Sequence, residues 1–466
     1  MSQRLAVTTG YVVLGAALLW SRLFHLGHSF WVDEIVMVDG YVRAGPREIL
    51  TSSGLNHQLM VLLSWVATTV AGESEIALRL LSAVPFIAGA ALVTAWLHGR
   101  VGPLSGMLFL FLATVSPLLL DITRQARGYG LAFLAMSVLV IAALEASRTG
   151  SIWAVTAMCA AGVLGAWTLP QFAIAFFATA ATLLLEKRIR LAVAVGLVLS
   201  AVAIYAWYAP HSSAVQSSSQ IPDGVQIAFP WVVTAPIDQV LLPALIWIDG
   251  TVLVAGFVWV PLVLLALVFI GSSPLLRTRA SALIMCSGAV TTTVVLWIGG
   301  AYVIPRYVSF LLVPLFMLVA TGAAAILQRA ARREAAVRTV VCVAVISLLT
   351  LRFAALAPDV VALPREANRD AADVIEADPA QLRVLAYVRN PRTLDFYLDR
   401  PVRDLRGSDV AAVVCGQDVT VFFVHQPFTL DPVDLPCLER SGVEHHRFAQ
   451  YARGDETNVW LVPPAA

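Results

Sequence analysis

Long apolar segments are the feature that most constrains this chain. A helix needs about 18 to 20 apolar residues to cross the roughly 30 Å core of a bilayer, and about eleven such segments are present. The 466 residues are 59% hydrophobic and 13% charged, with a mean hydropathy of +0.80, unlike soluble domains. We therefore expect an all-α polytopic membrane bundle, with spans at 6–23, 76–97, 103–120, 130–147, 152–168, 171–185, 190–208, 251–271, 281–299, 307–327 and 339–357.

The distribution of charges predicts the orientation, because Lys and Arg accumulate in short cytoplasmic loops. The first span lacks a clear cleavage site and is expected to be a retained helix. With the N-terminus in the cytoplasm, the inner loops receive only three acids, Glu145, Glu186 and Glu334, but many bases. These bases are Arg4, Arg100, Arg148, Lys187, Arg188, Arg190, Arg277, Arg279, Arg329, Arg332, Arg333 and Arg338.

Two outer loops are long, 24–75 and 209–249. The first contains the sequence "HSFWVDE" and, at 59–70, an apolar piece that is too short to span and is expected to lie at the membrane interface. The second begins with a Ser/Gln-rich stretch. It is either a mobile cover over a substrate site or a plain connector.

The C-terminal segment has a different composition. Residues 358–466 contain more than half of the chain's 30 acidic residues and no span. The stretches "RVLAYV", "DVAAVVC" and "VTVFFVH" are strand-like, whereas "REANRDAADVIEA" is helix-like. We expect a transmembrane module at 1–357 followed by a soluble α/β domain at 358–466, on the extracytoplasmic side because the number of spans is odd.

Two cysteines, Cys415 and Cys437, lie outside the predicted spans, and both fall in this C-terminal segment. An extracytoplasmic compartment permits disulfides. We predict a bond between them, the alternative being two buried thiols.

Candidate chemical groups gather on the predicted outer face. A partly desolvated carboxylate such as Asp33 or Glu34 can deprotonate a hydroxyl, and arginines bind phosphate through bidentate contacts. These residue types together suggest a reaction on a lipid phosphate. Asp33 or Glu34 could instead cap a helix or form a salt bridge, and His57 could be a base, a ligand or a core histidine. The remaining candidates are Asn56, Arg79, Arg124, Arg127 and Arg306.

An ordered set of motifs resembles the glycosyltransferase C (GT-C) superfamily over about residues 1–330. Within it, the chain is most similar to the bacterial family 39 type, which resembles protein O-mannosyltransferases and lipid A aminoarabinose transferases. No motif in the C-terminal domain contributes. The motifs are "FWVDE", "NHQ", "GESEIALRLLSAV", "GRVGPLSG", "SPLLLDITRQARGYGLAFL" and "IPRYVSFLLVPL".

The resemblance implies an inverting transfer of a sugar from a polyprenyl-phosphate donor to an acceptor hydroxyl on the outer face. Asp33 would be the base and Glu34 its helper. Arg127 with Tyr129, and Arg306 with Tyr307, would hold the donor phosphate, joined by Arg79 and Arg124. Asn56 and His57 would lie on the acceptor side. Many relatives have His-Pro at this place, whereas Gln58 follows His57 here.

The resemblance also bears on cofactors and partners. Some family members hold a divalent ion near the site. A divalent metal is possible here too, but its candidate ligands show no clear ligand spacing, so we expect no essential metal. These candidates are His25, His28, Asp33 and His57. The expected partners are a polyprenyl-phosphate sugar and a lipid, polysaccharide or protein acceptor of the bacterial plasma membrane and cell envelope. The sequence does not specify the sugar, the acceptor or the oligomeric state.

Two other functions are compatible with the sequence. A lipid-linked-sugar flippase or transporter would place charges near the middle of the bilayer, often within inverted repeats. Here the charges lie at span ends and no repeat is found, which favours an enzyme. A non-catalytic envelope scaffold would not require Asp33.

Overall fold

The chain folds into two compact units in a computed structural model that describes residues 3–51, 57–211, 268–298 and 305–330, and residues 346–464 with short gaps. The first unit comprises Met1–Phe24, Gly45–Glu73 and Ala77–Ala357. The second comprises His25–Ala44, Ser74–Ile76 and Pro358–Ala466. The first outer loop is therefore divided between the units, whereas the sequence analysis assigned all of it to the membrane module.

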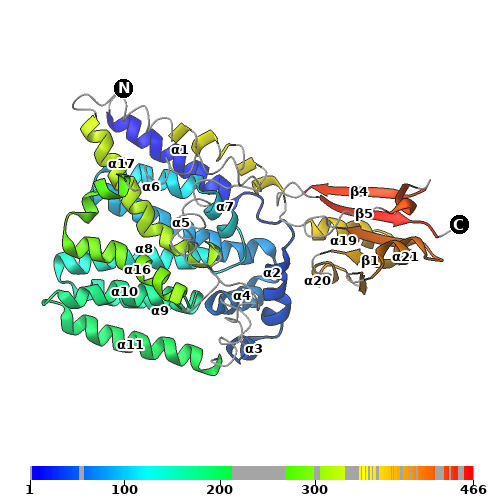
Figure 1. Cartoon of the computed structure of the whole chain (residues 1–466), viewed down its shortest axis with the longest axis horizontal. Helices are drawn as coiled ribbons and strands as arrows, with labels where there is room; N and C mark the ends of the chain where they lie inside the picture. Colours follow the sequence, from blue (N-terminus) through cyan, green and yellow to red (C-terminus); the bar gives the residue numbers. More distant parts are fainter. Residues whose placement is uncertain are drawn as a thin grey trace. The chain divides into compact units, whose positions relative to one another are not determined.

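The first unit is helical, as Figure 1 shows. Among the described residues, five helices are long and apolar enough to cross a membrane, or six if the bent pair α6 and α7 is one span. The predicted spans at 251–271 and 339–357 lie largely outside the described residues. The helices are α1 (Gln3–Leu23), α3 (Pro46–Thr51), α4 (Gln58–Ala71), α5 (Glu75–Arg100), α6 (Pro103–Val115), α7 (Pro117–Thr123), α8 (Tyr129–Thr149), α9 (Ile152–Thr168), α10 (Phe172–Thr182), α11 (Arg190–Tyr208), α16 (Arg279–Ile298), η6 (Pro305–Leu311) and α17 (Leu312–Ala330).

Close helix packing forms the core of this unit. Helix α9 lies beside α8, α10 and α11, and α10 also packs on α16 (Figure 1). Gly162 and Gly165 on α9 face the rings of Phe176 and Phe172, and a Cβ at either glycine would run into its ring. Small residues thus allow the close approach of helices that membrane bundles use.

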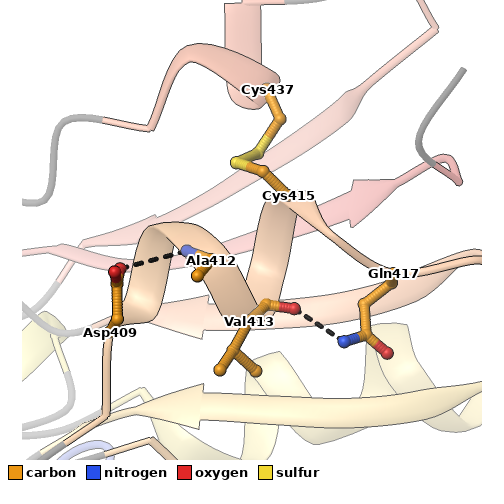
Figure 2. The surroundings of a disulfide bond; sticks show 6 residues. All are labelled: Asp409, Ala412, Val413, Cys415, Gln417 and Cys437. Carbon is orange, nitrogen blue, oxygen red and sulfur yellow. Dashed lines mark hydrogen bonds between the residues drawn. A yellow bond between two sulfur atoms is a disulfide. The ribbon is translucent and has the colours of Figure 1, made fainter.

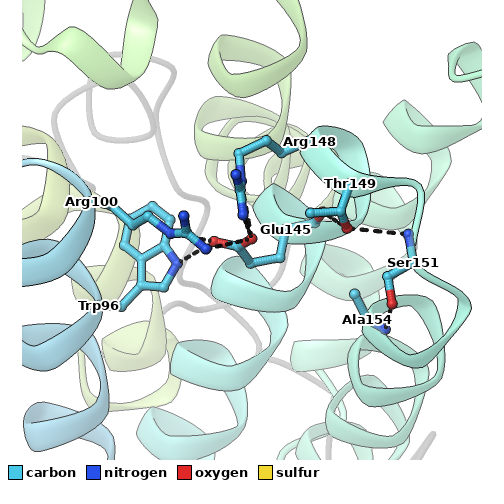
Figure 3. A network of polar contacts seen from close by, with 7 residues as sticks. All are labelled: Trp96, Arg100, Glu145, Arg148, Thr149, Ser151 and Ala154. Carbon is cyan, nitrogen blue, oxygen red and sulfur yellow. Dashed lines mark hydrogen bonds and ion pairs between the residues drawn. The ribbon is translucent and has the colours of Figure 1, made fainter.

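A polar network joins the ends of α5 and α8. The Glu145 carboxylate accepts hydrogen bonds from Trp96 Nε1 at 2.9 Å and from Arg148 Nη2 at 2.7 Å, and it pairs with Arg100. Figure 3 shows these side chains converging on Glu145. The network lies at the predicted cytoplasmic ends of the spans and borders a cavity of about 680 Å³.

A sharp bend separates α6 from α7. The two helices meet at 64°, where Ser116 caps α7 and Pro117 begins it. Proline has no N–H to offer, so the last carbonyls of α6 need other donors. Arg22 supplies them: Nη2 lies 3.0 Å from Ala113 O and 3.2 Å from Thr114 O. The Arg22 side chain is fully buried.

Arg124 performs the same task at the end of α1. Its Nη1 donates to Ser21 O at 2.8 Å and to Phe24 O at 2.9 Å. Arg22 near the end of α1 therefore caps α6, and Arg124 after α7 caps α1. A cation beside helix C-terminal carbonyls is also favoured by the helix dipole. These two arginines fix the bend and α1 to each other.

The second unit contains a five-stranded sheet with the order β2-β1-β3-β5-β4. Strand β1 runs parallel to β2 and β3, and β5 runs antiparallel to β3 and β4. Helix α19 (Asn368–Glu376) contributes to the apolar cluster on one face, and α21 (Val410–Cys415) to the cluster on the other. The strands are β1 (Arg383–Tyr387), β2 (Val402–Asp404), β3 (Val421–His425), β4 (Glu444–Ala449) and β5 (Glu456–Val462).

The stretch "DVAAVVC" forms a helix, so its strand assignment from the sequence was wrong. Asp409 is the N-cap of α21, and its carboxylate accepts from Ala412 N at 3.1 Å, as Figure 2 shows. This cap outweighs the β-propensity of the valines. The other segments fold as predicted, into β1, β3 and α19. Cys415, at the end of α21, is disulfide-bonded to Cys437 in η8 (Pro436–Glu439) (Figure 2).

His425, at the end of β3, is buried with its ring stacked on Tyr387. Its Nε2 has no hydrogen-bond partner among the described residues. Burial lowers the pKa of His425 to about 4, because charging the ring would place a cation in an apolar site.

The arginine caps generate a first prediction. Arg22→Met keeps the apolar stem but leaves the carbonyls of Ala113 and Thr114 without this donor, at a cost of about 1–3 kcal/mol each. We expect the apparent Tm of the detergent-solubilised protein to fall by several degrees, measured by size-exclusion chromatography after heating. Arg188→Met, at an exposed position, is the matched control. Equal Tm values for the two variants would contradict the capping role.

His425 generates a second prediction, on pH. The unfolded chain has the ordinary histidine pKa of about 6.5, so between about pH 6.5 and pH 4 the unfolded state binds a proton that the folded state does not. The domain should lose stability as the pH falls through this window. Hydrogen-exchange protection of β3, corrected for intrinsic rates, measures the loss. The loss of protection on acidification should be smaller in His425→Phe than in wild type. An identical loss in both proteins would refute the role of His425 in this pH dependence.

Candidate functional site

The Asp33–Glu34 pair lies on α2 (Val32–Met37), in the second unit. Glu34 is fully buried, and its carboxylate accepts from Trp31 N at 3.1 Å. Glu34 thus caps the start of α2, where a negative charge also suits the helix dipole. Asp33 is only half-buried. Of the two carboxylates, Asp33 is therefore the more exposed.

The connection between α7 and α8 positions the next group of candidates, in the first unit. It carries Arg127, which is largely buried, and leads into Tyr129, the first residue of α8. The ring of His57, which precedes α4, contacts the Tyr129 ring edge-on at 4.8 Å between centroids. The motifs "NHQ" and "ARGYG" are therefore in direct contact, although 72 residues separate the two aromatic rings.

Gly128 makes this contact feasible. A Cβ at Gly128 would lie 3.0 Å from His57 Nδ1 and would run into the Thr168 side chain. Contacts at that distance are tighter than side chains normally tolerate. The glycine in "ARGYG" therefore allows α9 and the histidine to approach the α7–α8 connection.

His57 is electrostatically unusual. It is buried, and neither of its ring nitrogens has a hydrogen-bond partner among the described residues. Burial, and then the nearby charges of Arg127 and Arg306, hold the pKa of His57 well below its ordinary value. The imidazole is therefore neutral at pH 7. Strongly shifted pKa values cluster at functional sites, so His57 marks this neighbourhood as a candidate.

Arg306 and Tyr307 lie on η6, which packs against α7 and α8. Both side chains are half-buried, and the guanidinium carbon of Arg306 lies 5.6 Å from the centre of the Tyr307 ring. Because Arg306 acts on the pKa of His57, it belongs to the same neighbourhood as Arg127. The first unit thus brings together His57, Arg127, Tyr129 and Arg306, which we call the cation cluster.

The other candidates lie in different settings. Arg124 donates to the end of α1, as described above, so part of its guanidinium already has a structural task. Arg79 is buried near the start of α5. Asn56 lies outside the described residues. The role of Arg22 was not predicted from the sequence, because capping depends on a bend elsewhere in the chain.

Two further features concern other ligands. No group of three or more His, Cys, Asp or Glu in the described parts of the chain is arranged to hold a metal ion. The cavity bordered by Arg100 and Arg148 lies at the far end of α8 from Tyr129, about 30 Å away at 1.5 Å per residue. That cavity is thus separate from the cation cluster.

Comparisons with known proteins give matches in structure alone. No family model and no curated protein sequence matches the chain. ArnT from Cupriavidus metallidurans, solved with undecaprenyl phosphate bound, aligns with a TM-score of 0.55 at 14% identity, over 98% of each chain.

Two larger proteins also align. The Archaeoglobus fulgidus oligosaccharyltransferase, solved with a tethered acceptor peptide, has a TM-score of 0.52 at 11% identity. The alignment covers 91% of this chain and 69% of the oligosaccharyltransferase chain. The mycobacterial arabinofuranosyltransferase AftD has a TM-score of 0.50 at 13% identity, covering 99% of this chain and 40% of its own. All three are GT-C members, so this chain has the fold of the GT-C superfamily, as its motifs predicted.

Proposed function

We propose that the chain is an integral membrane glycosyltransferase that moves a sugar from a polyprenyl-phosphate donor to a cell-envelope acceptor hydroxyl. The cation cluster is the observation that carries this proposal. Arg127 and Arg306 both lie near the buried His57, since their charges lower its pKa, and two arginines gathered at one place suit an anionic group such as a phosphate. The shared fold with glycosyltransferases supports the same conclusion.

The reaction follows from these groups. Asp33 accepts the proton of the acceptor hydroxyl while the hydroxyl oxygen attacks the anomeric carbon of the sugar. The bond from that carbon to the phosphate oxygen breaks, and polyprenyl phosphate leaves with the electron pair. Attack opposite the leaving group inverts the anomeric configuration. No covalent intermediate with the enzyme forms.

The cations matter more than the strength of the base. The rate at which a sugar phosphate reacts is limited by the charge that develops on its leaving group. Fixed positive groups at that position stabilise the transition state by several kcal/mol in a water-poor site. Arg127 and Arg306 are proposed to bind the phosphate oxygens. The rest of the proposed phosphate-binding site consists of Tyr129, Tyr307, Arg79 and Arg124. His57, and Asn56 beside it, are proposed to lie on the acceptor side.

The proposal also fixes an orientation. The acceptor would be reached on the outer face of a bacterial plasma membrane, with the N-terminus in the cytoplasm and residues 358–466 outside. This orientation rests on the distribution of arginines and acids along the chain.

Asp33→Asn tests the base directly. The amide keeps the size of the side chain but cannot accept the proton, so we expect transfer to fall by about 10²- to 10⁴-fold with an unchanged elution profile. The measurement is transfer from radiolabelled polyprenyl-phosphate sugars to extracted envelope acceptors by purified protein. Glu48→Gln, an exposed carboxylate in the same loop, is the control. Equal transfer by Asp33→Asn and wild type would remove Asp33 as the base.

Arg127→Met tests the phosphate contact in the same assay. Loss of the guanidinium should reduce kcat/KM for the donor by about 10- to 10³-fold, and Arg47→Met, exposed in the first outer loop, should not.

Donor movement across vesicles without formation of a glycosylated product would favour a flippase. Wild-type protein active in neither assay would favour the scaffold.

A further inference from the structure

The segment that carries Asp33 belongs to the same compact unit as the C-terminal domain. Residues 25–44 and 74–76 group with Pro358–Ala466, and α2 packs against α20 (Arg392–Asp395). Helix α2 has only six residues, too few to be stable alone. Its position must therefore be set by tertiary contacts.

Phe30, three residues before Asp33, is held through its backbone and its side chain. Its N–H donates to Tyr397 Oη at 2.6 Å, and its carbonyl accepts from the buried Asn368 Nδ2 at 3.4 Å. Its ring meets the Phe396 ring edge-on at 6.1 Å. Both backbone groups of one residue just before α2 are thus satisfied by the C-terminal domain.

Tyr397 also reaches the start of α5. Its hydroxyl donates to Glu75 Oε1 at 3.3 Å, so it accepts one hydrogen bond and donates another. Glu75 forms an ion pair with Arg369, whose Nη1 donates to Gly27 O at 3.3 Å. Glu75 is the first residue of α5, a candidate span. Tyr397 therefore links the Asp33 segment to the start of a membrane helix.

The end of the segment is held as well. After α2 the chain continues through η1 (Val38–Val42) to Arg43, whose guanidinium lies 4.3 Å from the centre of the Phe396 ring. Phe396 thus contacts residues on both sides of α2. The segment is fixed at its two ends by adjacent residues, Phe396 and Tyr397, of the C-terminal domain.

We propose that the C-terminal domain positions the catalytic loop, with Tyr397 as the main positioning residue and Asn368, Phe396 and the Arg369–Glu75 pair in support. The inference rests on the proposed function in assigning Asp33 as the base. A base must lie within about 2.6–3.2 Å of the proton it takes, and misplacement by about 1 Å can cost 100-fold in rate. Residues that anchor the chain at Phe30, three positions before Asp33, would thus control turnover without touching substrate.

Tyr397→Phe tests this role. It keeps the ring but removes both hydrogen bonds of the hydroxyl. We expect kcat to fall about 10- to 100-fold with little change in KM for the donor, and hydrogen exchange across residues 28–44 to increase. Tyr387→Phe, on β1 and away from these contacts, should leave kcat and exchange at wild-type values.

A charge swap supplies the second test. Glu75→Arg and Arg369→Glu should each reduce kcat and increase exchange, and the double variant should recover part of both. Recovery should be incomplete, because an arginine in the first turn of α5 opposes the helix dipole.

The exchange measurement separates the two proposals. If Asp33→Asn keeps full transfer, the proposed base is wrong, yet exchange across 28–44 still reports whether Tyr397 anchors the segment. Wild-type exchange in Tyr397→Phe would overturn the anchoring. Increased exchange with unchanged kcat in Tyr397→Phe would show that the anchoring does not control catalysis.

Discussion

The helical unit depends on satisfying backbone carbonyls where helices end inside an apolar interior. An unpaired buried carbonyl is costly, and the bend at Ser116–Pro117 creates such carbonyls. Arg22 and Arg124 meet this need. Arg22, near the end of α1, donates to the end of α6, and Arg124, after α7, donates to the end of α1. The burial of a charge is offset because each guanidinium has several acceptors. The connection that carries Arg127 and leads to Tyr129 begins directly after Arg124.

The cation cluster belongs to the helical unit, and the proposed base belongs to the unit that contains the sheet. A rigid sheet domain is a better support for a six-residue helix than a free loop, because its side chains are locked by packing. This arrangement gives the C-terminal domain a task that its sequence does not indicate. It also places Glu34 in a capping role, because its carboxylate accepts from Trp31 N.

The sequence was informative where the local pattern is strong. Apolar length identified long helices such as α5, α8 and α11, and alternation identified β1 and β3. The pattern failed at "DVAAVVC", where a single N-cap at Asp409 decided for a helix. It also could not separate Asp33 from Glu34, since adjacent carboxylates look equivalent until one of them bonds to Trp31 N. Tyr397 has no sequence signal, because its importance depends on contacts with Phe30 and Glu75, more than 300 residues away.

The sequence by itself determined a polytopic helical membrane protein with a GT-C motif order and an α/β C-terminal segment. These properties follow from apolar length, charge placement and local residue pattern, which act over short stretches of chain. Only the tertiary structure decided that His57 is buried near the charges of Arg127 and Arg306. It also decided that Arg22 and Arg124 cap helices, and that the Asp33 segment is held by the C-terminal domain. Those properties depend on burial and on contacts between distant residues, which no local pattern encodes.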